Sequence, residues 1–166
     1  DVLACIKTEA DMVQWAGSIF TWPMTQKQFR EHIRAGKRNP VSLYPFALIK
    51  SNHILGYCEL SRLCRNSNQA MLSRVLILPK YRNQGMATFM IDGVLSYGFR
   101  RLNLNRIGLG VFDFNEAAIR CYRKSGFILE GTLRESAKVG DSYWNCHLMS
   151  ILRNEWDVRE SLQQAR

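Results

Sequence analysis

Arg82 and Gly85 stand together in the stretch YRNQGMATFM (residues 81–90), where an apolar run ends and a segment of helical spacing begins. Pro79 ends the apolar run, and Gly85 permits an unusual backbone dihedral or a close approach of the backbone to a ligand. A helix that begins here exposes unpaired N–H groups and the positive end of its dipole. With the cation of Arg82, these groups could bind a phosphate. An ordinary strand–helix turn would use Asn and Gly as well.

Two common phosphate motifs do not fit the chain. The P-loop needs GxxxxGK[ST], and this stretch has no Lys followed by Ser or Thr. The dinucleotide fingerprint GxGxxG would need a third glycine after Gly108 and Gly110, but position 113 is Asp, and the two glycines lie within a predicted strand. Neither kind of nucleotide site is therefore predicted.

A third pattern fits. Arg82, Gly85 and Ala87 form RxxGxA after a strand and at the start of a helix, which resembles the acetyl-CoA motif Q/R-x-x-G-x-G/A of the GNAT superfamily of N-acetyltransferases. The stretch NEAAIRCYRKSGF (115–127) is similar to a later helix of that superfamily. GFILEGTLRES and SYWNCHLMSILRNEW resemble the branch that contains ribosomal-protein N-terminal acetyltransferases and spermidine acetyltransferases. The resemblance covers most of residues 1–156.

The resemblance implies that the chain binds acetyl-CoA as a co-substrate. The segment from Arg82 to Thr88 would cradle the pyrophosphate, with backbone amides facing its oxygens. The end of the preceding strand would offer backbone groups to the pantetheine arm, because family members splay this strand from the next and form a V-shaped slot. The cofactor-binding residues implied are Leu76, Ile77, Leu78, Arg82, Asn83, Gln84, Gly85, Met86, Ala87, Thr88, Asn115 and Tyr122.

The implied reaction moves an acetyl group to a primary amine, on a protein N-terminus or a small molecule, by direct attack in a ternary complex. A catalytically silent module of the same fold, which binds acyl-CoA as a sensor, is the alternative. A nucleic-acid-binding domain would suit the net charge of +9, but the chain has no helix-turn-helix or RNP-type signature. We therefore expect acetyl-CoA and an amine as partners, with no nucleic acid or membrane, for a monomer or homodimer.

Acetyl transfer needs an acid for the departing thiolate and a route for the proton of the amine. Tyr122 lies seven residues after Asn115, about two helical turns, so both share one face of a helix and the phenol could protonate the thiolate. A core aromatic is the alternative. Strand alternation in ILGYCELSRL places Glu59 where it could draw a proton through water, or stand as a solvated carboxylate. His147 is a rival base, and many family members have no dedicated base.

The acceptor pocket should involve the first helices and the loop at residues 15–23. Trp15, Phe20 and Trp22 are either walls of this pocket or core residues. Residues 11–36 contain no acidic run, and a net charge of +9 repels polycations over a Debye length of about 8–10 Å. We therefore predict that the acceptor is not a polyamine.

A small set of helices and strands must position these groups. Caps and apolar spacing predict helices at 8–17, 23–37, 84–101 and 115–127. Apolar runs predict strands at 2–6, 70–78, 106–112, 127–136 and 142–152, and a two-stranded hairpin at 44–64 with SNH in its turn. A polar tail that could be helical follows. This order indicates an α/β or α+β domain. The resemblance adds a mixed, mostly antiparallel sheet of six to seven strands, splayed centrally, with about four helices on its faces.

Length and composition limit the remaining possibilities. A chain of 166 residues predicts a single domain over 1–166, and the balance of 46% hydrophobic and 22% charged residues is that of a globular protein. No apolar run approaches the roughly 18 residues of a membrane span. The five cysteines are scattered without a CxxC pair, which indicates reduced thiols and no metal site. With no secretory signal at the start, these features predict a cytoplasmic location.

Overall fold

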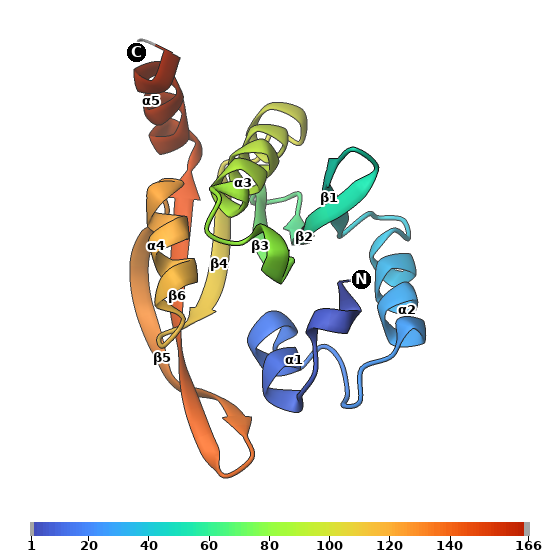
Figure 1. The fold of residues 1–166 in the computed structure, drawn as a ribbon. Coiled ribbons are helices and arrows are strands. Elements are labelled where there is room, and N and C mark those ends of the chain that lie inside the picture. The colour runs from blue at the N-terminus through green and yellow to red at the C-terminus, as the bar shows by residue number, and fades with distance from the viewer. Residues whose placement is uncertain (1, 165–166) are drawn as a thin grey trace.

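A six-stranded sheet forms the centre of the molecule in the computed structural model, which describes residues 2–164 (Figure 1). The strands lie in the order β1-β2-β3-β4-β6-β5, and each neighbouring pair is antiparallel except β3 and β4. Their bounds are Tyr44–Lys50 (β1), His53–Cys64 (β2), Gln69–Ile77 (β3), Arg106–Phe112 (β4), Ile128–Val139 (β5) and Ser142–Leu152 (β6). The predicted mixed, mostly antiparallel sheet is confirmed.

The described residues contain five α-helices, and three of them begin at a side chain that caps the first turn. Thr8 and Asp11 form a reciprocal capping box, Thr25 accepts a hydrogen bond from the backbone N–H of Gln28, and Asn115 accepts one from that of Ala118. The helices are Glu9–Ala16 (α1), Gln26–Gly36 (α2), Met86–Ser96 (α3), Glu116–Lys124 (α4) and Arg153–Gln164 (α5). The polar tail is thus helical.

Helices cover both faces of the sheet. Cys58 and Leu60 of β2 belong to the main core, which α3 completes with Ile91, Leu95 and other apolar side chains. The alternate residues of β2 face the other way and meet α1 and α2, since the ring of Tyr57 packs against Phe29 of α2. Figure 1 shows α3 and α4 along one face of the sheet, and α1 and α2 together at the side of β1 to β3.

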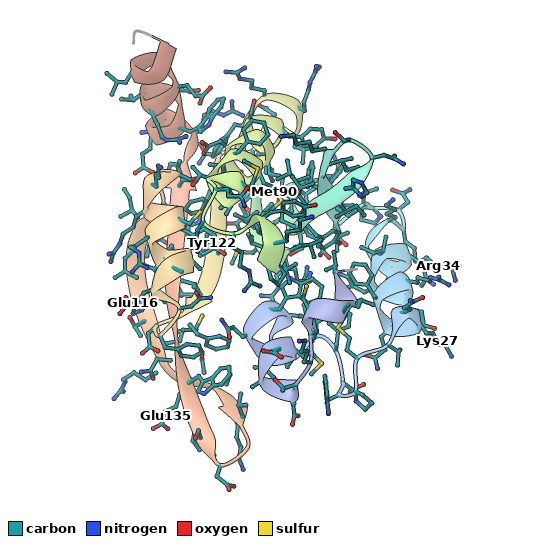
Figure 2. The ribbon with its side chains drawn as sticks, in the orientation of Figure 1. Lys27, Arg34, Met90, Glu116, Tyr122 and Glu135 are labelled. Atoms are coloured by element: carbon teal, nitrogen blue, oxygen red, sulfur yellow. The ribbon has the colours of Figure 1, made fainter. Side chains whose placement is uncertain are left out.

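Side chains follow the same division between core and surface. Met90 and Tyr122 point inward between the helices and the sheet, and both are buried (Figure 2). Lys27 and Arg34 project outward from α2 in the same view. A second, smaller core of Met12, Ala16 and Phe20 joins α1 to the segment before α2. The N-terminal helices therefore have apolar packing of their own beside the main core.

The predicted strand at residues 2–6 is wrong, because Leu3–Cys5 forms a single 3₁₀ turn. A strand needs a neighbour to pair with, and the apolar Ile6 instead packs against the small core of the N-terminal helices. The helix predicted at 84–101 also differs at its end, where the α-helix passes into a π turn at Tyr97–Arg101.

The strands β3 and β4 pair only at their starts. Their register joins Gln69 to Arg106, Ala70 to Ile107 and Met71 to Gly108, and ends there. In contrast, β4 pairs with β6 over its whole length, as far as Phe112. The second halves of β3 and β4 therefore diverge, which confirms the central splay and opens a wedge in the middle of the sheet.

Candidate active site

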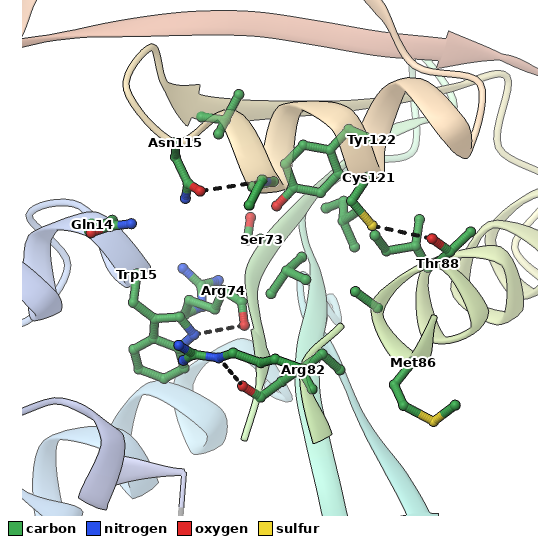
Figure 3. A pocket seen from close by; sticks show the side chains of 18 of the residues that line it. Gln14, Trp15, Ser73, Arg74, Arg82, Met86, Thr88, Asn115, Cys121 and Tyr122 are labelled. Carbon is green, nitrogen blue, oxygen red and sulfur yellow. Dashed lines mark hydrogen bonds between the residues drawn. The ribbon is translucent and has the colours of Figure 1, made fainter. Parts of the chain in front are cut away.

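A cavity of about 340 Å³ occupies the wedge between β3 and β4 (Figure 3). Both strands, the first turns of α3 and α4, and one edge of α1 form its walls. Its polar lining residues are Gln14, Ser73, Arg74, Tyr81, Arg82, Asn83, Thr88, Asn115 and Tyr122, and its apolar ones include Trp15, Ile77, Met86, Ala87, Val111 and Phe112.

The start of α3 borders this cavity, and we call its segment Arg82–Thr88 the cradle, because an uncapped helix start is the kind of site that can bind an anion. Gly85 is the N-cap residue with a φ of +75°, in the left-handed region that glycine adopts without strain, and no side chain caps the helix. The N–H groups of the first turn are therefore free of a side-chain acceptor. Arg82 donates from Nε to the carbonyl of Ile77 (3.0 Å), which holds the loop on the end of β3.

The structure brings most of the predicted cofactor-binding residues to one cavity. Three of them do not line it: the buried Leu76, Leu78 at the end of β3, and Gln84, whose amide donates to the carbonyl of Lys80. Those that do line it are Ile77, Arg82, Asn83, Gly85, Met86, Ala87, Thr88, Asn115 and Tyr122.

Tyr122 points from α4 into the cavity, toward Ser73 and Arg74 on β3 (Figure 3). It is 8% exposed and its ring packs edge-on against Phe127, but its hydroxyl has no hydrogen-bond partner among the described residues. Burial raises the pKa of this phenol, so it stays protonated at neutral pH. A buried phenol without a partner is an available proton donor.

Glu59 lies behind the cavity wall and does not line it. Its side chain is fully buried, so the expected alternative of a solvated carboxylate is wrong. The carboxylate accepts hydrogen bonds from the Tyr57 hydroxyl (2.6 Å), His32 Nε2 (3.0 Å) and Arg74 Nε (2.6 Å), and it pairs with a second Arg74 nitrogen. Burial acts to raise the pKa of Glu59, but these hydrogen bonds outweigh it and hold the pKa below its usual value.

The sequence pattern of the Acetyltransferase (GNAT) family matches residues 10–127. The chain belongs to this family. The match covers α1 to α4, including the splayed strands, the cradle and Tyr122.

Curated relatives of the chain include proteins named as N-acetyltransferases. Spermidine N(1)-acetyltransferase of Escherichia coli is 36% identical over 83 residues, which are 50% of this chain and 45% of the relative. An uncharacterized N-acetyltransferase of Bacillus subtilis, YoaA, is 39% identical over 77 residues, 46% of this chain and 44% of the relative. The alignments with these curated relatives thus span less than half of their length.

Solved structures share the fold over more of the chain. A point mutant of the spermidine N-acetyltransferase SpeG from Vibrio cholerae has a TM-score of 0.74 at 26% identity, with 82% of this chain and 80% of that one covered. A spermidine N-acetyltransferase from the same organism, in complex with CoA and spermine, has a TM-score of 0.77 at 23% identity, with 92% and 88% covered.

Of the remaining residues that the sequence suggested for the base or the acceptor pocket, only Trp15 lines the cavity. His147, the rival base, does not line the cavity, and its Nδ1 lies 2.8 Å from the Thr132 hydroxyl. Of the three aromatics of the first loop, Trp15 lines the cavity, Phe20 is buried in the small core, and Trp22 is 41% exposed.

The described residues contain neither a candidate metal cluster nor a candidate membrane-spanning helix. Within residues 2–164 no group of three or more His, Cys, Asp or Glu could hold a metal ion. None of the helices in this range has the length and apolar character of a membrane span.

Sequence reasoning missed Arg74, which lines the cavity from β3. Among the described lining residues, Arg74 and Arg82 are the charged ones, so none is acidic. The signal for Arg74 was present, since it is a lone charge in the apolar strand AMLSRVLIL. A charge is rarely buried in such a strand without a partner, and the partner here is the Glu59 carboxylate.

We predict that Glu59→Gln lowers the free energy of unfolding by about 3–5 kcal/mol at pH 7, because the Arg74 cation loses its buried partner. Since the pKa of Glu59 is lowered in the folded state, its stabilising effect is present above the usual value of 4.5 and is lost as the pH falls below it. Urea unfolding at pH 3 to 7 should show the two proteins converging in acid.

The matched control is Glu160→Gln, which removes the partner of Arg100 in a pair with side-chain exposures of 25% and 55%. This change should cost less than about 1 kcal/mol. A constant difference between wild type and Glu59→Gln across this pH range would contradict the ionised, paired state of Glu59.

Proposed function

We propose that the chain is an acetyl-CoA-dependent N-acetyltransferase that moves the acetyl group to a primary amine by direct attack within a ternary complex. The observation that carries this proposal is the cavity between the diverging strands, which the cradle borders and whose wall holds the unpartnered hydroxyl of Tyr122. Membership of the GNAT family supports the same reaction.

The cavity offers groups of the right kind for each part of acetyl-CoA. The amides of the Arg82–Thr88 segment and the Arg82 guanidinium would bind the pyrophosphate, as N–H groups at a helix start do for phosphates. Beyond Met71, β3 has no partner on the side of the wedge. There the carbonyls of Arg74 and Ile77 accept hydrogen bonds from Trp15 and Arg82. The remaining backbone groups that face the wedge could hydrogen-bond the amides of the pantetheine arm, as an added strand would.

The side chains and backbone around the wedge suit the chemistry of the transfer. As the amine nitrogen bonds to the carbonyl carbon and the C–S bond breaks, backbone N–H groups of β3 would stabilise the oxyanion. Tyr122 would give its proton to the departing thiolate as a general acid. Both groups line the cavity from opposite walls.

We do not assign the base to Glu59, despite the expectation from strand alternation. Its carboxylate is occupied by its three neighbours and its pKa lies below the usual value, so it is a weak acceptor for the proton of an amine. An alkyl ammonium has a pKa of about 10.4. We propose that the amine attacks in its neutral form. The proton that its nitrogen loses as the amide forms would pass to water, and water would return a proton to the Tyr122 phenolate after the thiolate has taken one.

The acceptor in this proposal carries little positive charge beyond its reacting amine. The charged groups among the described lining residues are Arg74 and Arg82, and the nearest buried carboxylate, Glu59, is already paired. A polyamine would need carboxylates to replace its lost hydration. We therefore propose a protein N-terminus or a small monoamine, although several relatives are spermidine acetyltransferases.

Gly85→Glu should abolish acetyl-CoA binding, measured by calorimetry, because a carboxylate in the cradle repels the pyrophosphate. The control is Gly140→Glu, in the turn between β5 and β6. Both glycines have positive φ, and a Cβ added at either would meet only open space, so the backbone strain is matched. Unchanged affinity in Gly85→Glu, or no binding by the wild type at millimolar acetyl-CoA, would refute the cradle.

Tyr122→Phe should reduce kcat by about 10²-fold, as expected when a general acid is lost, while the affinity for acetyl-CoA stays the same. Tyr143→Phe, at a tyrosine that is 56% exposed, is the control and should leave kcat unchanged. Equal turnover by wild type and Tyr122→Phe would make Tyr122 a core aromatic only.

Neutral monoamines and N-terminal peptides should be acetylated with higher kcat/KM than spermidine. The measurement is acetyl-CoA turnover across these amines at two salt concentrations, because screening weakens attraction between exposed charges. A preference for spermidine that weakens as salt rises would show that a local acidic pocket governs the choice. Binding of acetyl-CoA without turnover of any amine would instead support the silent sensor.

A further inference from the structure

One residue of β3 lies outside the regular ladder with β2. Tyr57 pairs with Leu76 and Glu59 pairs with Ser73, so two steps along β2 match three along β3. This is a β-bulge, in which the extra residue leaves the ladder and its strand bends. Within it, Arg74 has a φ of +52°, a left-handed conformation that non-glycine residues adopt only where their surroundings hold them.

Two contacts hold Arg74, one at its side chain and one at its backbone. The guanidinium donates from Nε to Glu59 Oε2 (2.6 Å), pairs with that carboxylate through a second nitrogen, and is only 3% exposed. The backbone carbonyl of Arg74 accepts a hydrogen bond from Trp15 Nε1 of α1 (2.9 Å). We call Trp15, Glu59 and Arg74 the bulge clamp.

The clamp is itself fixed on the side away from the cavity. Tyr57 and His32 donate to the Glu59 carboxylate, so β2 and α2 both orient it. The Trp15 ring packs against Phe20, Phe29 and Tyr57 with centroid distances of 6.1 to 6.2 Å. Neither end of Arg74 is therefore free to relax into an ordinary strand conformation.

We propose that Glu59 and Trp15 are positioning residues, which hold the bulge so that its backbone donors meet the carbonyl oxygen of the acetyl group. The proposal rests on the proposed acetyl transfer. Ser73, Arg74 and Val75 line the cavity. Tyr122 faces Ser73 and Arg74 across it (Figure 3). Donors to a developing oxyanion must be held to within about 0.5 Å to be effective. The clamp supplies that restraint, with Trp15 and Arg74 in the cavity wall and Glu59 behind it.

This role differs from two simpler ones for Glu59. A base would have to reach the amine, but Glu59 does not line the cavity. A carboxylate that merely neutralised Arg74 would not account for the bond from Trp15 to the Arg74 backbone, which restrains the same residue from another element. The clamp therefore predicts that Trp15→Phe and Glu59→Gln impair the same step.

The test follows the thioester carbonyl of bound acetyl-CoA, labelled with ¹³C, by infrared difference spectroscopy without an amine. Trp15→Phe and Glu59→Gln should shift its stretch to higher frequency than in the wild type, because hydrogen bonds to the oxygen weaken. Turnover with an amine should show kcat lower by about 10-fold or more, within the range for a lost oxyanion donor. The Kd for CoA, which has no acetyl group, should change by less than about twofold.

Each variant has a matched control. Trp156→Phe makes the same change at a buried tryptophan whose Nε1 has no hydrogen-bond partner in the part of the chain that the structure describes. Glu130→Gln removes a carboxylate that accepts from Arg106 and Ser150, away from the cavity. Both controls should leave the carbonyl stretch and kcat as in the wild type.

The outcomes separate this proposal from the proposed function. If acetyl-CoA binds but the carbonyl stretch is the same in wild type and clamp variants, the clamp is wrong and the acetyltransferase proposal stands. If the affinity for CoA fell in parallel with kcat and the carbonyl stretch did not shift, the variants would have loosened the whole fold. This result would also overturn the clamp. If Glu59→Gln does not fold, Trp15→Phe decides alone. Failure of the wild type to bind acetyl-CoA would defeat both proposals.

Discussion

The short pairing between β3 and β4 is the constraint on which the rest of the molecule depends. A parallel pair within an antiparallel sheet needs a crossover, here through α3, and three paired positions suffice to anchor it. Because β4 then follows β6 instead of β3, the strands separate, and the first turns of α3 and α4 stand on the two sides of the opening. The cavity thus arises from the divergence of the two strands, and α1, α3 and α4 complete its walls.

Burial of the Glu59 carboxylate is the second constraint, and it connects the sheet to the N-terminal helices. A charge in this position is stable only with its donors in place, and these come from α2, from β2 and from β3. The N-terminal helices therefore supply specific hydrogen bonds in addition to apolar packing. Their removal would leave the carboxylate without one donor and the Arg74 backbone without the Trp15 hydrogen bond.

Local patterns sufficed for much of the fold and for part of the site. Caps at Thr8, Thr25 and Asn115 located three helices. The spacing from Asn115 to Tyr122 predicted that both share one helix face, and the structure shows that both line the cavity. Local patterns could not predict features that depend on contacts between distant parts of the chain. Strand alternation gave the face on which Glu59 lies, but whether that face meets water or helices depends on elements far along the chain. The same holds for residues 2–6, which are apolar enough for a strand but find none to pair with.

The N-terminal helices have their own small core of Met12, Ala16 and Phe20, and they contribute only Gln14 and Trp15 to the cavity. Trp15 is committed to a structural hydrogen bond, whereas no such bond constrains the side chain of Gln14 within the described residues. A substitution at Gln14 would therefore change the shape and polarity of this part of the cavity wall at little cost in folding.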